Sequence, residues 1–219
     1  MKLHLIWDMD GTLVDSEPEI LATIQKSLQT INLSVKNASS PLRIGPPLSI
    51  VLRNSFSIDV LSDEQVDLVI KEFRKIYDSS DFEETKPFEG IDEIIKSEGF
   101  VHHVITNKPD FATRRIIEKK GWNQYVPDVL SPNTLLNEMG RQMKKQELFQ
   151  YFKTNNPELK VLGIGDMAGD AECAHLAGIP AIGVLWGTGT KEELEQAGCE
   201  AIVSNVNELV NSLKTYSNE

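Results

Sequence analysis

Short apolar runs recur along the chain and alternate with segments of helical periodicity. The runs span Leu3–Trp7, Phe100–Ile105, Val126–Leu130, Lys160–Ile164 and Pro180–Leu185. They are apolar on both faces, which is typical of parallel strands that are covered by helices on each side. The pattern therefore predicts an α/β fold built on a parallel sheet.

One interval is too long for a single crossover helix. About ninety residues separate the first apolar run from the second, whereas a crossover needs far fewer. Two stripes at helical spacing occupy part of this interval, Ile20, Ile24 and Leu28 in one and Val66, Val69, Ile70, Phe73 and Tyr77 in the other. We therefore predict a helical domain at residues 15–86, inserted into a discontinuous core of residues 1–14 and 87–219.

The charge balance restricts the partners. The chain carries 33 acidic and 22 basic residues, for a formal net charge of -11. Nucleic acids and anionic membranes attract a basic face, so neither is an expected partner, whereas a small anionic substrate needs a local cation. The two cysteines, Cys173 and Cys199, suggest no disulfide framework, and neither a signal-peptide pattern nor a membrane-length apolar run is present. We expect a cytoplasmic monomer or homodimer.

Polar residues follow three of the predicted strands. They are Asp8 and Asp10 after the first strand, Thr106 and Asn107 after the second, and Asp166 with the nearby Asp170 after the fourth. Because the carboxyl ends of parallel strands form the ligand-binding edge of such sheets, we expect these residues to lie together. Adjacent ionised acids are costly in a core, and Mg²⁺, which prefers oxygen ligands, would stabilise them. The alternative is that Asp8 and Asp10 only cap the following turn.

Three segments carry a family resemblance. WDMDGTLVDSE (7–17), VITNKP (104–109) and GIGDMAGD (163–170), in this order, resemble motifs of the haloacid dehalogenase-like hydrolases, especially of their phosphoglycolate phosphatase-like branch. The resemblance covers nearly the whole chain. It implies a doubly wound, Rossmann-like core with an inserted helical cap. It also implies Mg²⁺-dependent hydrolysis of a small phosphorylated metabolite through an aspartyl phosphate. Phosphoglycolate is the first substrate candidate.

The resemblance also implies roles for the residues of the first two motifs. Asp8 would attack phosphorus. Asp10 would protonate the leaving oxygen and then activate water, while its backbone carbonyl binds the metal. The Thr106 hydroxyl and the Asn107 backbone N–H would bind the phosphoryl oxygens.

The later motifs would serve the metal and the phosphoryl group. Asp166 would bind Mg²⁺ directly, and Asp170 would hold a metal-bound water or orient its neighbours. Asp170 is also a predicted N-cap of a helix over 171–177. The family's lysine is commonly followed by proline, but this chain has Lys144 and Lys145 without one. The spacing to the following helical stripe favours Lys145, with Lys144 as the alternative.

Other residues bear on specificity and on rival functions. Arg43 and Arg53, in the predicted cap, are candidates to bind a second anionic group of the substrate, although exposed arginines usually face solvent. A phosphotransferase resembling beta-phosphoglucomutase would use the same acids, and a non-catalytic phosphate-binding protein is a third hypothesis. The histidines are interpreted as packing or surface residues, and no zinc site is predicted; they are His4, His102, His103 and His175.

Overall fold

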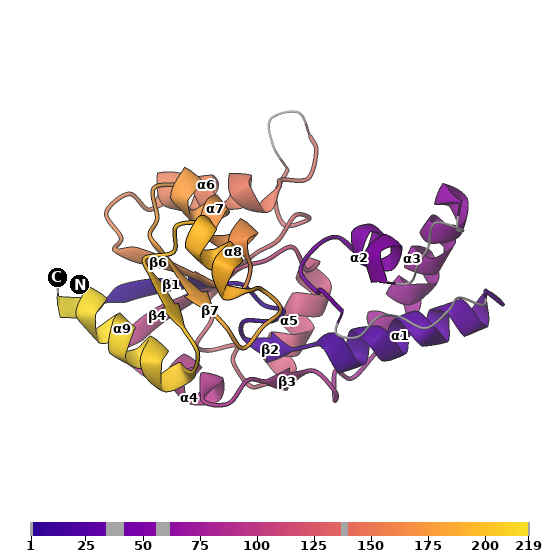
Figure 1. The fold of residues 1–219 in the computed structure, drawn as a ribbon, viewed down its shortest axis with the longest axis horizontal. Coiled ribbons are helices and arrows are strands. Elements are labelled where there is room, and N and C mark those ends of the chain that lie inside the picture. Colours follow the sequence, from indigo (N-terminus) through magenta and orange to yellow (C-terminus); the bar gives the residue numbers. More distant parts are fainter. Residues whose placement is uncertain (1, 34–41, 56–61, 137–139, 219) are drawn as a thin grey trace. The chain divides into compact units, whose positions relative to one another are not determined.

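The structure is a computed structural model that describes residues 2–33, 42–55, 62–136 and 140–218 (Figure 1). The chain divides into two compact units, a core unit of Met1–Asp15 with Pro87–Glu219 and a helical unit of Ser16–Lys86. The short strands β2 (Val14–Asp15) and β3 (Lys86–Pro87) pair at the two points where the chain passes between the units. Across the described ranges, no helix combines the length and the apolar character needed to cross a membrane.

The core unit is built on a six-stranded sheet with the order β5-β4-β1-β6-β7-β8, in which every neighbouring pair is parallel. The strands are β1 (Leu3–Trp7), β4 (Phe100–Ile105), β5 (Asp128–Leu130), β6 (Val161–Gly165), β7 (Ala181–Val184) and β8 (Ala201–Val203). Strands β4 and β5 lie on one side of β1, and the later strands β6, β7 and β8 lie on the other side. The carboxyl ends of β4, β1 and β6 are therefore neighbours at the point where the winding reverses. The predicted doubly wound α/β fold is confirmed.

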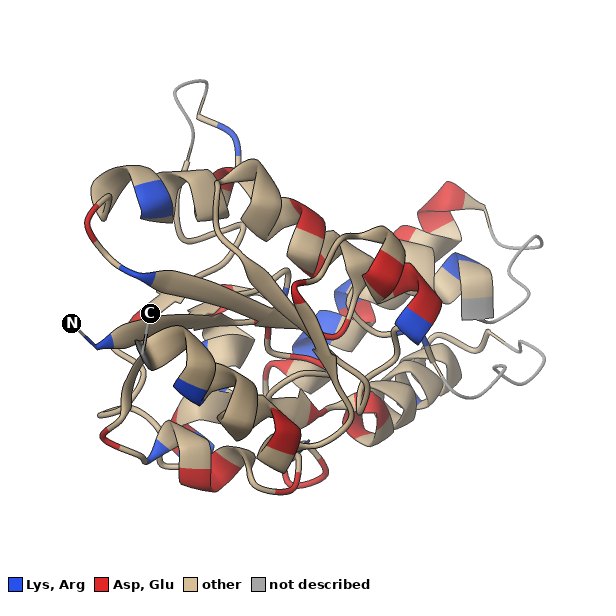
Figure 2. Ribbon diagram, turned by 60° about the vertical axis from the view of Figure 1, so that its left-hand side comes forward, with Lys and Arg blue, Asp and Glu red and all other residues tan. Residues whose placement is uncertain are grey.

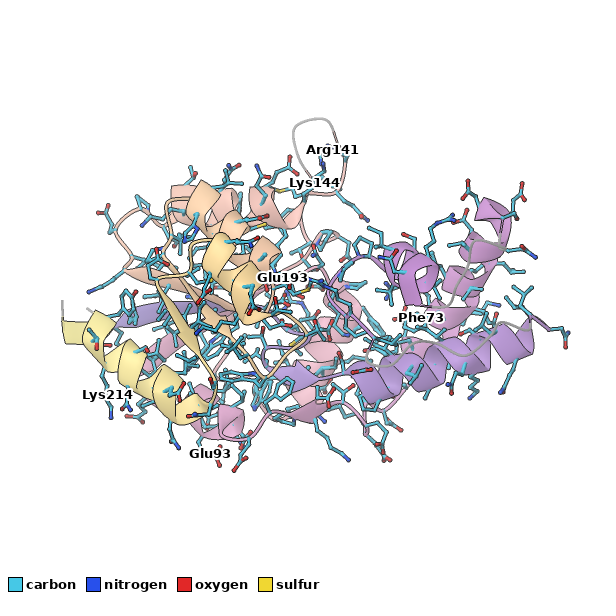
Figure 3. The ribbon with its side chains drawn as sticks, in the orientation of Figure 1. Phe73, Glu93, Arg141, Lys144, Glu193 and Lys214 are labelled. Atoms are coloured by element: carbon cyan, nitrogen blue, oxygen red, sulfur yellow. The ribbon has the colours of Figure 1, made fainter. Side chains whose placement is uncertain are left out.

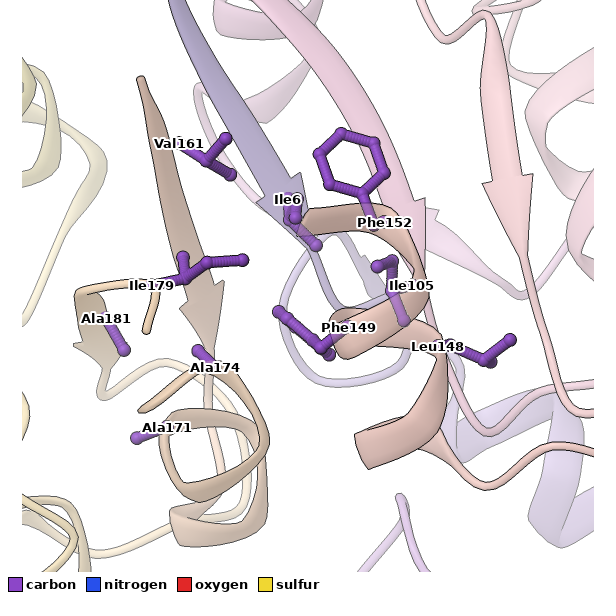
Figure 4. Close-up of a cluster of buried hydrophobic side chains, with 10 residues drawn as sticks. All are labelled: Ile6, Ile105, Leu148, Phe149, Phe152, Val161, Ala171, Ala174, Ile179 and Ala181. Carbon is purple, nitrogen blue, oxygen red and sulfur yellow. The ribbon is translucent and has the colours of Figure 1, made fainter. Parts of the chain in front are cut away.

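Helices cover both faces of this sheet (Figure 2). They are α4 (Ile91–Ile95), α5 (Asp110–Lys119), α6 (Lys145–Asn155), α7 (Ala168–Leu176), α8 (Lys191–Gln196) and α9 (Val206–Asn218). Apolar side chains of α6 and α7 pack against Ile6, Ile105 and Val161 of the sheet (Figure 4). Phe149 and Phe152 supply the α6 side of this cluster. The burial of these rings holds α6 on the sheet, and thereby positions the residue at its start.

The helical unit contains α1 (Glu17–Thr30), α2 (Leu48–Ser55) and α3 (Asp63–Tyr77). The predicted stripes form its core, because Ile20, Ile24 and Leu28 of α1 and Val66, Val69, Phe73 and Tyr77 of α3 are buried. Helices α1 and α3 pack against each other. The start of α3 is fixed by a reciprocal pair of hydrogen bonds between Ser62 and Gln65, which satisfies two otherwise unpaired backbone donors.

Two adjacent histidines of β4 are buried in the core unit. The Trp7 indole Nε1 donates to His102 Nδ1 over 3.0 Å. A ring nitrogen of His103 lies 3.0 Å from a carboxylate oxygen of Asp128, and the other lies 2.9 Å from His4 Nδ1. Burial lowers the pKa of both β4 histidines, to about 4 for His102. These rings belong to the core packing and are not in the group of described residues that could hold a metal ion.

The His102→Gln variant is expected to reduce the acid sensitivity of the fold. Because the pKa of His102 is about 4 when folded and 6.5 ordinarily, the unfolded chain takes up this proton first as the pH falls. The wild type therefore loses about 2 to 3 kcal/mol of unfolding free energy between pH 6.5 and 4 through this one group. Urea titrations at several pH values measure the slope. His175→Gln, at a partly exposed ring, is the control, and a slope in His102→Gln equal to that of the wild type would contradict the expectation.

Candidate active site

Three acids of the core unit come together at the carboxyl edge of the sheet. Asp8 follows β1, Asp166 follows β6, and Asp170 lies in the first turn of α7. One carboxylate oxygen of each lies within 4.8 Å of the others. Asp8 is 6% exposed and Asp166 is completely buried. Among the described residues these acids form the group that could hold a metal ion.

The charges of this acid cluster are poorly accommodated without a cation. Burial raises the pKa of Asp8 to about 7, and the charges of Asp170 and Asp166 add to the effect while Lys145 opposes it. Burial likewise raises the pKa of Asp166 to about 6, again helped by Asp170. Oxygen donors at this spacing suit a hard divalent cation, whose charge would favour the ionised carboxylates.

Lys145 is the lysine that contacts the acid cluster. Its Nζ lies 2.6 Å from Asp8 Oδ1 and 2.6 Å from Asp170 Oδ1. Burial opposes the charge of Lys145, but the carboxylates of Asp170 and Asp8 raise its pKa well above the usual range. Lys144 is exposed at the N-cap of α6 (Figure 3). The register of α6 thus brings Lys145, and not Lys144, to the acids.

Asp10 is paired with a lysine that the sequence analysis does not single out. Lys108 Nζ lies 2.9 Å from Asp10 Oδ1 and 3.2 Å from Oδ2, and both residues are buried. Thr106, at the end of β4, is buried and accepts the Lys108 backbone N–H at 3.2 Å. Asn107 lies exposed between them. The sequence signal that could have identified Lys108 is its position, because it lies only two residues after Thr106, close to the carboxyl end of β4.

Two threonines orient the Asp166 carboxylate, and neither is a candidate from the sequence. Thr12 Oγ1 donates to Asp166 Oδ1 at 3.0 Å, while the backbone N–H and the hydroxyl of Thr188 donate to Oδ2 at 2.8 and 3.2 Å. The Trp186 indole N–H donates to the Thr12 carbonyl at 3.0 Å. The loop that follows β7 is thereby tied to the loop that follows β1, and Asp166 is held between them.

Gly11 lies against Asp166 at a position where a side chain does not fit. Its φ is +81°, and an added Cβ would lie 2.5 Å from Asp166 Oδ2. We expect Gly11→Ala to lower the unfolding free energy by about 2 to 4 kcal/mol, because backbone strain and the clash add together. Gly121→Ala is the matched control, since Gly121 has φ +71° but no described atom within 4 Å of the added Cβ. Urea unfolding measures both variants. Equal losses of unfolding free energy in Gly11→Ala and Gly121→Ala would show that the contact with Asp166 adds nothing, and would contradict the prediction.

The prediction that Asp170 is an N-cap is wrong. Helix α7 begins at Ala168, so that Asp170 occupies its third position. From there its Oδ2 accepts the backbone N–H of Met167, which is the N-cap residue, at 3.0 Å. Asp170 therefore stabilises the helix start with one oxygen while the other contacts Lys145. The pattern misplaces the helix start because helix boundaries are the least reliable part of a sequence assignment.

The two candidate arginines belong to the helical unit. Arg43 is exposed, and the Arg53 side chain, 43% exposed, forms an ion pair with Asp63. Both lie outside the unit that carries the acid cluster. A contact of either arginine with a substrate stays a prediction.

Comparison with known proteins identifies relatives along most of the chain. The family model described as haloacid dehalogenase-like hydrolase matches residues 5–184. The phosphoglycolate phosphatase of Xylella fastidiosa (strain Temecula1) is 25% identical over 197 residues, which cover 86% of this chain and 82% of the relative. The phosphoglycolate phosphatase of Aquifex aeolicus is 28% identical over 192 residues, which cover 84% of this chain and 84% of the relative. A crystal structure described as a predicted phosphatase from Clostridium acetobutylicum has a TM-score of 0.79 at 26% identity, over 98% of this chain and 99% of that one.

The family match includes the segments that carry Asp8, Thr106 and Asp166. The predictions of this superfamily, of its phosphoglycolate phosphatase-like branch and of a hydrolase of the phosphatase type are confirmed. The chain belongs to the haloacid dehalogenase-like hydrolases.

Proposed function

We propose that the chain is a Mg²⁺-dependent phosphomonoester hydrolase that acts on a small phosphorylated metabolite through an aspartyl phosphate on Asp8. The observation that carries the proposal is the double contact of the Lys145 ammonium, at 2.6 Å, with Asp8 and Asp170. A carboxylate nucleophile must approach an anionic phosphoryl group, and a fixed cation at this point reduces their repulsion. All three of these residues belong to the core unit.

The reaction proceeds in two displacements at phosphorus. In the first, an Asp8 carboxylate oxygen attacks phosphorus and the bond to the leaving oxygen breaks, while Asp10 gives its proton to that oxygen. In the second, Asp10 takes a proton from a water molecule whose oxygen attacks the same phosphorus. The bond between phosphorus and Asp8 then breaks and inorganic phosphate is released. Proton transfer of this kind contributes about 10²–10⁴ to the rate.

Three further residues bind the phosphoryl oxygens in this proposal. The Thr106 hydroxyl and the Asn107 backbone N–H donate hydrogen bonds to them, and Lys145 supplies positive charge beside the nucleophile. The support for this assignment is that Thr106 directly follows β4, and that β4 pairs with β1, which Asp8 directly follows. Donors held by strand ends need little rearrangement when negative charge develops.

The donor set fits a magnesium ion. Asp8 and Asp166 would hold it through their carboxylates and Asp10 through its backbone carbonyl, while Asp170 keeps Lys145 in place. The support is the clustering of oxygen donors and the raised pKa of both Asp8 and Asp166. When bound, Mg²⁺ supplies positive charge that offsets the charge on the phosphoryl oxygens.

Phosphoglycolate is the proposed substrate, on the ground that the relatives from Xylella fastidiosa and Aquifex aeolicus are named phosphoglycolate phosphatases. Cys173 and Cys199 are free thiols, which agrees with a reducing compartment, and we place the reaction in the cytoplasm.

A panel of small phosphate esters tests the proposal. It contains phosphoglycolate and sugar phosphates, each assayed for phosphate release with Mg²⁺ and with a chelator. We expect release that requires Mg²⁺, with phosphoglycolate among the best substrates. Transfer of the phosphoryl group to a sugar phosphate in preference to water would replace hydrolysis by a mutase reaction. No metal-dependent release from folded protein on any ester would refute the proposed function.

A further inference from the structure

Two buried lysines of the core site form ion pairs with different acids. Lys145 contacts Asp8 and Asp170, whereas Lys108 contacts both carboxylate oxygens of Asp10, at 2.9 and 3.2 Å. The Lys108 side chain is 4% exposed and that of Asp10 is 10% exposed. The site therefore has two fixed positive charges that serve separate carboxylates.

The backbone of Lys108 is held by its neighbours in the core unit. Its N–H donates to Thr106 Oγ1 at 3.2 Å, and its carbonyl accepts from Thr113 Oγ1, on α5, at 3.4 Å. Thr106 and Thr113 are themselves buried. The ammonium of Lys108 thus starts from an anchored backbone, which reduces the entropy lost when it binds an anion.

In the proposed mechanism, Lys145 and Lys108 lie beside different parts of the substrate. Asp8 acts at phosphorus, so Lys145 lies on the phosphoryl side. Asp10 acts at the leaving oxygen, which must come within about 2.6–3.2 Å of its carboxylate for proton transfer. Since Lys108 Nζ is 2.9 Å from Asp10 Oδ1, the ammonium lies beside the leaving group. A negative group close to the ester oxygen would therefore be within ion-pair distance of Lys108.

We propose that Lys108 is a specificity-determining residue that selects phosphate esters of 2-hydroxy acids, in which a carboxylate sits on the carbon that bears the ester oxygen. The inference rests on the proposed function, because it uses the role of Asp10 at the leaving oxygen. It goes further in naming the chemical feature that is recognised and the residue that recognises it. Phosphoglycolate is the smallest member of this class.

A matched pair of substrates separates this role from general support of Asp10. The pair is 2-phosphoglycolate and its amide, 2-amino-2-oxoethyl phosphate, which has nearly the same shape and the same ester bond but lacks the negative charge of the carboxylate. We expect the wild type to prefer the carboxylate by about 10- to 100-fold in kcat/KM, which is typical for a hydrogen bond to a charged group. Lys108→Met should bring the two values to within about threefold of each other, mainly through KM for the carboxylate.

Two variants control the measurement. Lys108→Arg keeps the positive charge and should retain most of the preference. Lys214→Met removes an exposed lysine of α9 (Figure 3) and should behave as the wild type. Circular dichroism establishes that each variant is folded before it is assayed. Equal losses for both esters in Lys108→Met would show that the lysine only supports Asp10, and would overturn the proposal.

A measurement on the wild type alone tests the proposal without relying on a variant that could be misfolded. Moving the carboxylate one carbon further from the ester oxygen, as in 3-phosphooxypropanoate, should remove most of the preference over the corresponding amide. An undiminished preference would contradict recognition beside the leaving oxygen. Failure to hydrolyse any phosphate ester with Mg²⁺ would refute the proposed function itself. Hydrolysis of both esters of the first pair at equal rates would refute only the role of Lys108.

Discussion

The Asp8→Asn variant is expected to release phosphate at least about 10⁴-fold more slowly than the wild type, because the amide oxygen cannot act as the nucleophile. Its fold should persist. The raised pKa of Asp8, about 7, means that the ionised carboxylate is a cost to the metal-free protein at neutral pH. Lys145 keeps its contact with Asp170 in this variant. Removal of the Asp8 charge should therefore leave the metal-free variant with an unfolding temperature equal to or above that of the wild type.

Phosphate release with saturating Mg²⁺ and thermal unfolding in chelator measure the two effects together. Asp67→Asn makes the same chemical change at an exposed position of α3 and should alter neither. Mass spectrometry of the assayed protein is needed, since deamidation would regenerate the aspartate. Activity of Asp8→Asn above about one per cent of the wild type, in protein free of deamidation, would remove Asp8 from the role of nucleophile.

Lys145→Met is expected to lower kcat/KM by about 10²- to 10³-fold, because a fixed cation beside the developing negative charge is lost. It should also destabilise the metal-free fold. Asp8 and Asp170 would lose the ammonium that contacts both at 2.6 Å, and removing one partner of a buried ion pair costs about 3 to 5 kcal/mol. Mg²⁺ should restore part of this stability, since it would neutralise the same acids.

Lys144→Met is the matched control, because it removes the neighbouring lysine at an exposed position. Its activity and its unfolding temperature should equal those of the wild type. The two variants are compared by steady-state phosphate release and by thermal unfolding with and without Mg²⁺. Loss of activity in Lys144→Met with normal activity in Lys145→Met would assign the catalytic role to the other lysine.

The strands of the core were predictable where apolar runs are long and buried on both faces. The bounds of β1 and β4 agree with the prediction, and β5, β6 and β7 differ by a residue or two at their ends. Strand β8 (Ala201–Val203) was missed, because only three apolar residues mark it and two of them are only partly buried. Strand β5 is equally short, but it lies in a predicted run of five residues, 126–130. Periodicity needs more residues than that to distinguish a strand from a loop.

The acids of the site were predictable for a different reason. Asp8 and Asp166 directly follow strands β1 and β6, and Asp10 lies two residues after Asp8. Parallel strands bring their carboxyl ends to one edge wherever the chain between them goes. Lys108 was missed because lysines are mostly exposed to solvent, and its sequence position alone does not indicate burial. Thr12 and Thr188 were missed because their common partner, Asp166, is distant from both along the chain.

By itself the sequence determined the fold class and the edge of the sheet on which the acids gather, because these follow from local periodicity and from residues at strand ends. It indicated the family through the resemblance of three motifs. Only the tertiary structure decided which of Lys144 and Lys145 reaches Asp8, and that Lys108 pairs with Asp10. The first choice depends on the rotation of α6 about its axis, which Phe149 and Phe152 set by packing on the sheet. A change of one residue in a helix turns a side chain by about 100°, so the packing of α6 fixes which lysine faces the acids, and it is the one that the spacing of the helical stripe favours.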